Sequence, residues 1–157
     1  MGAANDLMVT LLEANLEFVT STVADMTDKE LAERPCPASH PALWQLGHVV
    51  AGEAYILGVL DPSFTAPTES FMAAFSDGRN VPASLPDKAT ILAELKRVRA
   101  SVIALAQRID ESKLKDASPL PWAKTLGELL MLVPGHATMH IGQIQVLRRK
   151  LGKPVLF

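Results

Sequence analysis

The sequence predicts an all-α protein built as a bundle of four long amphipathic helices. Apolar residues recur at three- and four-residue steps in four separate stretches, and segments rich in proline, glycine or polar residues divide them. No stretch alternates apolar and polar residues for long enough to indicate a strand. With 157 residues and 48% hydrophobic content, the chain suits one domain, 1–157, that buries a sizeable core.

The first helix is expected over residues 5–25, with Asn5 or Asp6 as its N-cap. Its apolar stripe consists of Met8, Leu11, Leu12, Val19 and Val23. A short helical turn over 28–33 is expected to follow, before the proline-flanked Cys36 breaks the pattern.

The second helix is expected to begin near Pro41, because proline is favoured in the first turn, and to run to residue 60. The connection from there to about residue 86 contains four prolines and an Asp-Gly pair, so it is mostly loop. Connections of this length in a compact domain tend to be functional or to carry a short extra helix.

The third helix has the clearest pattern, with a stripe over residues 91–109. Lys96, Arg97 and Arg99 are expected on the side opposite this stripe. A polar linker over 110–121 then leads to the fourth helix.

The fourth helix has recognisable signals at both ends. Thr125 and Glu128 have the spacing of a capping box, and Gly152 is expected to close the helix. The basic run 148–150 lies in the last turns, where cations complement the helix dipole, so we interpret it as a solvated helix end.

Charge and composition exclude several classes of partner. A net charge of −2 gives no electrostatic reason to expect nucleic acid. No run reaches the ~18 uninterrupted apolar residues of a membrane span, and the N-terminus lacks the pattern of a secretory signal. The single cysteine, Cys36, cannot form an intrachain disulfide, which fits the expectation of a cytoplasmic protein.

Three of the chain's four histidines fall on inward-facing stripes. His136 and His140 are four residues apart, so they are separated by only ~40° around the fourth helix and point into the bundle at a spacing suited to one metal ion. His48 shares the inward stripe of the second helix with Trp44 and Tyr55.

A lone buried histidine is more often a hydrogen-bonded core residue than a ligand, but three are harder to satisfy without a metal. Each neutral ring carries a donor and an acceptor that must both be matched in the interior, and a metal takes one nitrogen from each ring. Three protein ligands also leave a coordination position open, as in catalytic sites. Gly47 and Gly52 beside His48 indicate close backbone approach or room for a ligand.

The neighbours of these histidines receive other interpretations. His40, near the start of the second helix, is expected to be exposed or capping. Glu53 lies ~140° around the helix from His48, so it is no natural fourth ligand. Pro134 is expected to kink the fourth helix and to affect where His136 points.

Two segments resemble the DinB/YfiT-like superfamily: residues 43–53, LWQLGHVVAGE, and residues 135–143, GHATMHIGQ, followed by the basic end at 148–152. The resemblance covers essentially the whole chain in order and spacing. It implies an up-down-down-up four-helix bundle, often a homodimer, in which His48, His136 and His140 hold one divalent metal.

Characterised relatives in that superfamily include bacillithiol S-transferases, mycothiol-dependent maleylpyruvate isomerases and a domain of ergothioneine-type sulfoxide synthases. Gly142 stands where the synthases have a glutamate, and His136 stands where the isomerases have one. The three-histidine set is therefore most similar to the thiol S-transferase type.

The leading hypothesis is a metal-dependent S-transferase that joins a small thiol to small electrophiles, with Gln143, Tyr55 or Trp44 orienting the substrate. No side chain identifies itself as a general base, so the catalytic residues stay open. Metal-assisted hydrolysis and a non-catalytic metal-binding or stress-response module are the alternatives. Three imidazoles accept Zn, Ni, Fe or Mn, so the ion is not identified.

Overall fold

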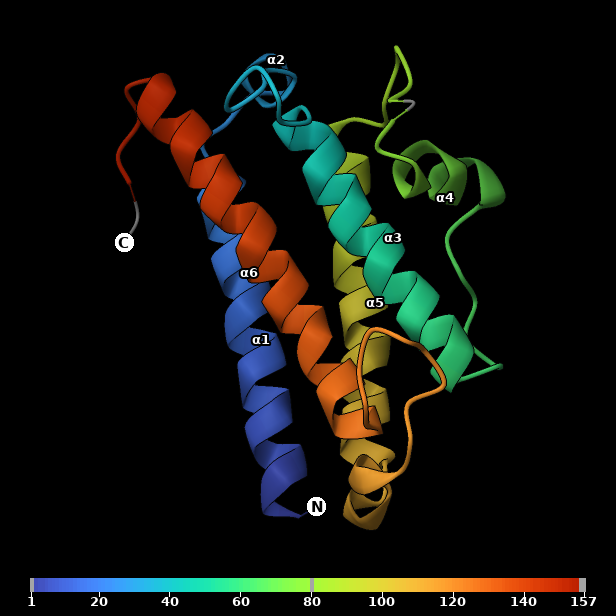
Figure 1. Cartoon of the computed structure of the whole chain (residues 1–157). Coiled ribbons are helices and arrows are strands. Elements are labelled where there is room, and N and C mark those ends of the chain that lie inside the picture. The colour runs from blue at the N-terminus through green and yellow to red at the C-terminus, as the bar shows by residue number, and fades with distance from the viewer. Residues whose placement is uncertain (1, 80, 156–157) are drawn as a thin grey trace.

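The computed structural model describes residues 2–79 and 81–155, and its secondary-structure elements there are all helices. The bundle consists of four long helices, α1 Ala3–Val23, α3 Ala42–Leu60, α5 Lys88–Arg108 and α6 Leu126–Lys150. In Figure 1, α1 and α6 run in one direction and α3 and α5 in the other. The predicted all-α, up-down-down-up bundle is confirmed.

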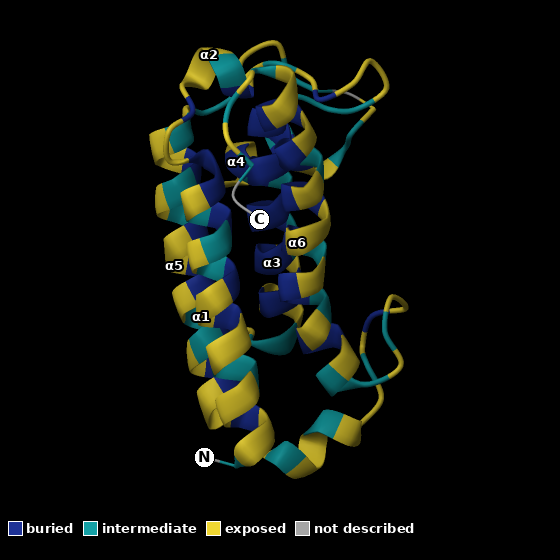
Figure 2. Cartoon of the chain, turned by 90° about the vertical axis from the view of Figure 1, so that its left-hand side faces the viewer, coloured by how far each residue is buried: buried dark blue, intermediate teal, exposed yellow. Residues whose placement is uncertain are grey.

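Each long helix packs against two of the others. α1 lies beside α5 and α6, and α3 lies beside the same two helices, so the four surround one core. Figure 2 shows buried residues on the inward faces and exposed residues on the outward faces. The fully buried side chains of this core include Leu12, Val19, Val50, Ile91, Val98, Leu129 and Ile144. Burial of these stripes is the main force that holds the helices together.

The helix α3 is the most apolar of the four. By length and composition it could cross a membrane, yet 67% of its most apolar window is buried inside the bundle. A buried core helix meets the same criteria of length and composition, so this helix by itself does not indicate a membrane span.

The long connection after α3 carries a short helix, which is one of the two alternatives that its length left open. This helix, α4 Glu69–Ser76, lies against α3 and buries Phe75 completely. A Cβ atom added at Gly47 would lie only 2.2 Å from the Phe75 ring. Gly47 is therefore required for the close approach of α4 to α3, which confirms one of the two interpretations of that glycine.

The start of α1 differs from the prediction, because α1 begins at Ala3 and Asn5 lies within its first turn. The backbone N–H of Ala4 instead donates to Glu111 Oε1 at 2.7 Å, and the Asn5 side chain donates to Ile109 O at 2.8 Å. A residue more than a hundred positions away thus caps this helix, which no local pattern can reveal.

The capping box at Thr125 is only half formed. Thr125 accepts from the backbone N–H of Glu128, but the Glu128 carboxylate accepts from Lys124 N at 2.7 Å. A complete capping box occurs instead at Thr27 and Glu30, at the start of the short helix α2 Asp28–Leu31. The C-terminal prediction is confirmed, since Gly152 follows α6 with a φ of +70°.

Arg99 does not lie on the solvent side of α5, so that prediction is wrong. Its side chain is fully buried and donates through Nε to Glu53 Oε2 at 3.0 Å, with a second bond from Nη2 to Glu53 Oε1. Nη1 also donates to Leu12 O at 2.8 Å and to Asn15 Oδ1 at 3.0 Å. Burial is tolerated because the guanidinium finds acceptors on both α1 and α3.

Arg148 is likewise buried and is not part of a solvated helix end, although Arg149 and Lys150 are exposed. It donates to Thr22 O at 2.8 Å and pairs with Asp25, which joins the end of α6 to α1. The hydrogen bond from Arg148 holds the pKa of Asp25 below its usual value.

Candidate metal centre

The three inward-facing histidines meet at one point in the bundle. One nitrogen from each of His48, His136 and His140 can be chosen so that all three atoms lie within 4.8 Å of one another. His136 Nε2 and His140 Nε2 are 3.1 Å apart, one turn from each other on α6. The predicted convergence of α3 and α6 histidines is therefore present.

His48 is held from two sides. Its Nδ1 lies 2.8 Å from Phe75 O at the end of α4, and its ring stacks on Trp44 with centroids 4.7 Å apart. A carbonyl can only accept, so Nδ1 carries the hydrogen and Nε2 keeps its lone pair free. This arrangement orients the ring as a backbone carbonyl commonly orients a metal-binding histidine.

His140 is oriented by Gln45, a residue that sequence reasoning missed. His140 Nδ1 lies 3.2 Å from Gln45 Oε1, while Gln45 Nε2 donates to His40 O at 2.9 Å. The second bond fixes which end of the amide faces His140, so Nδ1 donates and Nε2 carries a lone pair, which faces His136 Nε2. A fully buried amide one turn before His48 in an apolar helix is the signal that could have identified it.

His136 lies against a gap in α3 left by Gly52. A Cβ atom added at Gly52 would approach the His136 ring to 3.2 Å, so glycine leaves the imidazole room at this crossing. α6 continues through Pro134 without interruption, and Pro134 O accepts from Thr138 Oγ1 at 2.8 Å and from Asn15 Nδ2 at 3.2 Å. The turn before His136 is thereby tied to α1.

The electrostatic setting keeps the two α6 histidines neutral. Burial, with a smaller contribution from the charge of His48, lowers the pKa of His136 to about 4. Burial, with smaller contributions from the neighbouring histidines, lowers the pKa of His140 to about 3. Neutral imidazoles are the ligand form of histidine, so no proton must leave these two rings at neutral pH before an ion binds. Three converging imidazole nitrogens suit a divalent transition metal and suggest such a site.

The outer side of the cluster is an aromatic stack. Trp44 is buried between His40 and His48, and its Nε1 donates to Ala74 O at 3.1 Å. His40 is half-buried, with its Nε2 2.7 Å from Gly78 O, so the expectation that it is exposed or capping is wrong. The loop after α4 reaches this histidine, and that contact is invisible in the helical pattern.

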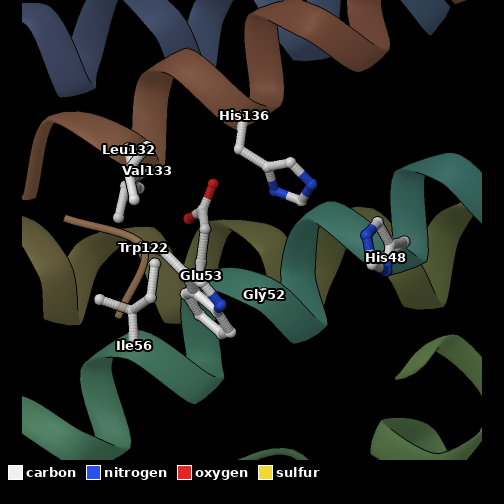
Figure 3. Close-up of a pocket in the computed structure, with 8 residues that line it drawn as sticks. All are labelled: His48, Gly52, Glu53, Ile56, Trp122, Leu132, Val133 and His136. Atoms are coloured by element: carbon white, nitrogen blue, oxygen red, sulfur yellow. The ribbon is translucent and has the colours of Figure 1, made fainter. Parts of the chain in front are cut away.

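Two cavities open beside the histidines on the other side. The first, about 310 Å³, is lined by His48, Gly52, Glu53, Ile56, Trp122, Leu132, Val133 and His136. The second, about 320 Å³, is lined by His48, Ala51, Gly52, Tyr55, Met72, Phe75, Ser76 and Trp122. Figure 3 shows Trp122, which precedes α6, facing the α3 residues of the first cavity, with the Glu53 carboxylate between α3 and α6.

A protein-family model matches the part of the chain that carries this arrangement. The model of the DinB superfamily matches residues 11–144, which include all three histidines. The chain belongs to the DinB superfamily.

Solved structures share this DinB-superfamily fold. A conserved protein from Enterococcus faecalis superposes with a TM-score of 0.77 at 20% identity, covering 98% of this chain and 99% of that one. YfiT from Bacillus subtilis, described as a probable metal-dependent hydrolase with an unusual four-helix bundle topology, superposes with a TM-score of 0.72 at 21% identity, covering 98% and 91%. A search of curated proteins gave no significant match.

The three expected substrate contacts occupy different places. Tyr55 lines the second cavity but is 49% exposed, so it lies at the rim and not on the inward stripe. Trp44 is buried against His48 and lines neither cavity. Gln143 is half-buried on α6 and also lines neither cavity. The cavity residue that sequence reasoning missed is Trp122, because it lies in a linker without periodicity.

Proposed function

We propose that this chain is a divalent-metal-dependent enzyme in which His48, His136 and His140 hold one ion. We further propose that it transfers a low-molecular-weight thiol to small electrophiles: a carbon–sulfur bond forms, the bond from that carbon to the leaving group breaks, and the leaving group and the thiol proton pass to solvent. The observation that carries the proposal is a three-histidine cluster that borders two mostly apolar cavities, with no free carboxylate among the described residues that line them.

Three protein ligands leave room for an exchangeable one. When bound, a divalent ion lowers the pKa of a coordinated thiol and so supplies a thiolate at neutral pH without a protein base. Zinc, nickel, iron and manganese are all compatible with three imidazoles.

The chain's own residues would set the geometry of the reaction. Phe75 O and Gln45 Oε1 hold the Nδ1 hydrogens of His48 and His140, which leaves both Nε2 atoms for the ion. The apolar walls exclude water from the electrophile, which protects the electrophile from hydrolysis in competition with attack by the thiolate.

Glu53 is the only carboxylate among the residues that line the two cavities, and it is unsuited to act as a base. Burial raises its pKa, yet both of its oxygens are engaged by Arg99. A base must be free to take a proton from the substrate, and this carboxylate is committed to its ion pair. Its role here is structural.

Metal-dependent hydrolysis is the second candidate, supported by the description of YfiT, which shares this fold. The same site would then activate water in place of a thiol. The lack of a free carboxylate on the cavity walls is the reason we place thiol transfer first.

The test is to reconstitute the protein separately with zinc, nickel, iron and manganese and to assay each form. Chlorodinitrobenzene with several small thiols reports transfer, and a panel of esters and amides reports hydrolysis. The proposal expects thiol conjugation that His140→Ala abolishes and that Met139→Ala, an exposed neighbour on α6, preserves. Ester or amide turnover alone supports hydrolysis, and tight metal binding without any turnover supports a non-catalytic module.

Homodimerisation, which the resemblance implies, and a cytoplasmic location also stay proposals. Light scattering on the purified protein tests the first. Cell fractionation tests the second.

A further inference from the structure

Trp122 borders both cavities. The two cavities share His48 and Gly52 at the metal centre, and the Trp122 side chain lines each of them. At about 310 and 320 Å³, each lies at the lower end of the range for small-molecule sites. A ligand that approaches the histidines through either cavity therefore meets a wall that includes this indole.

The Trp122 ring is exposed but its loop is anchored. Its side chain is 58% exposed, and its ring centroid lies 5.6 Å from that of Tyr55, also partly exposed. Ser118 N donates to Lys124 O at 3.0 Å across the base of the loop, and the side chain of Leu120 is buried. A large aromatic face is thus held at the mouth of the cavities with much of its surface in water, which a flat apolar ligand would cover favourably.

The charge of the lining selects among such ligands. Neither cavity is lined by a lysine or arginine, and the charged side chain in the first cavity is the carboxylate of Glu53. The buried Arg99 is committed to that carboxylate and to two acceptors on α1. Without a bound ion, an anionic ligand would lose its hydration there without gaining a cation partner from the cavity walls, whereas a neutral ligand loses nothing comparable.

We infer that Trp122, backed by Tyr55, forms the recognition wall for a neutral, flat aromatic electrophile in the first cavity. Ile56, Leu132 and Val133 form the apolar floor under that ligand. The inference deepens the proposed function by naming the class of electrophile, and it rests on that function for calling the ligand an electrophile. Binding itself can be measured without any turnover.

A matched pair of dyes tests the inference on the metal-free protein, in which no bound ion can attract an anionic dye. N-phenyl-1-naphthylamine is neutral, and anilinonaphthalene sulfonate is the same ring system with one negative charge. Both become fluorescent in apolar sites, so each dissociation constant follows from a titration. We expect the neutral dye to bind at least about tenfold more tightly than the sulfonate.

Variants assign the signal to Trp122. Trp122→Ala should weaken the neutral dye by about tenfold or more, while Trp122→Phe, which keeps an aromatic face, should stay within about threefold of the parent. Met139→Ala is the matched control, because Met139 is similarly exposed, at 56%, and lines neither cavity. Circular dichroism confirms that each variant stays folded.

Three results would overturn the inference. They are equal affinity for the two dyes, equal affinity in Trp122→Ala and Met139→Ala, and a protein dimer that only Trp122→Ala converts to a monomer. The last result would assign the indole to an interface between two copies. Absence of thiol conjugation together with the expected dye pattern would contradict the proposed function and leave the aromatic site standing.

Discussion

Replacing Arg99 by methionine tests the buried ion pair that joins three helices beside the histidine cluster. Arg99 on α5 is fully buried, and so is its partner Glu53 on α3, which is 1% exposed. The guanidinium also donates to Leu12 O at 2.8 Å and Asn15 Oδ1 at 3.0 Å on α1. Methionine has a similar apolar length, so the substitution removes the charge and the donors with little change in packing volume.

Removing one partner of a buried ion pair costs about 3–5 kcal/mol, because the remaining charge is left without compensation. The two α1 acceptors lose their donor as well, and each unsatisfied buried group costs about 1–3 kcal/mol. Because these terms overlap, we expect a loss of about 3–5 kcal/mol in the free energy of unfolding. That is a large fraction of the 5–15 kcal/mol that holds a typical domain folded.

The loss should depend on pH in a defined direction. Burial already raises the pKa of Glu53, and removal of Arg99 takes away the contacts that oppose this shift. A carboxyl whose pKa is higher in the folded state than in the unfolded state loses stability as pH rises through the folded value. The Arg99→Met variant should therefore lie closer to the parent at pH 5 than at pH 8.

Urea unfolding followed by circular dichroism measures these free energies. Glu53→Gln with Arg99→Met in one chain should recover part of the loss, because no charge is then left unpaired. Arg97→Met on the same helix is the control, since Arg97 pairs with Glu94 at the partly exposed surface and should cost less than about 1 kcal/mol. A loss below about 1 kcal/mol for Arg99→Met would refute the assignment of Arg99 as a core residue.

Three further predictions concern the site. Gln45→Leu removes the oxygen that orients His140, so metal affinity in a chelator competition should fall about 10- to 100-fold, and unchanged affinity would contradict the positioning role. Gly47→Ala places a Cβ atom 2.2 Å from the facing phenylalanine ring, so it should lower the free energy of unfolding in urea by about 1–3 kcal/mol. At the control position Gly58 an added Cβ atom meets nothing within 4 Å, so Gly58→Ala should not lower it. The metal-free protein should lose stability as pH falls below 6.5. The folded protein holds the pKa of His136 at about 4 and that of His140 at about 3, so these two histidines take up protons at higher pH in the unfolded chain than in the folded one. Thermal midpoints that stay constant from pH 7 to pH 4 would argue against this.

Periodicity predicted the parts of the molecule that depend on one helix at a time. The stripe of α6 placed His136 and His140 on its inward side, and the stripe of α3 did the same for His48. Whether these three histidines meet depends on how α3 and α6 cross. The family resemblance supported the expectation that they do. The length of the connection after α3 indicated either a functional loop or a short extra helix, and α4 is such a helix.

The contacts between elements could not be predicted in the same way. Arg99 and Arg148 lie next to apolar stripes in the sequence. Only the packed bundle shows that backbone carbonyls and carboxylates on other elements accept hydrogen bonds from them. Gln45 acquires its role because its amide meets His140 from another helix, 95 residues away. Trp122 lies in a linker whose path depends on tertiary contacts and on no repeating pattern.

Metal stoichiometry and affinity test the central claim most directly. The protein, stripped with chelator and reconstituted separately with zinc, nickel, iron and manganese, is analysed for bound metal beside His48→Ala, His136→Ala and His140→Ala variants. The matched control is Met139→Ala, and circular dichroism shows that all variants are folded. We predict one ion per chain in the parent and the control with at least one of these metals, and loss of it in each histidine variant. A parent protein that retains none of the four ions, or histidine variants that retain the ion as the parent does, would contradict the account.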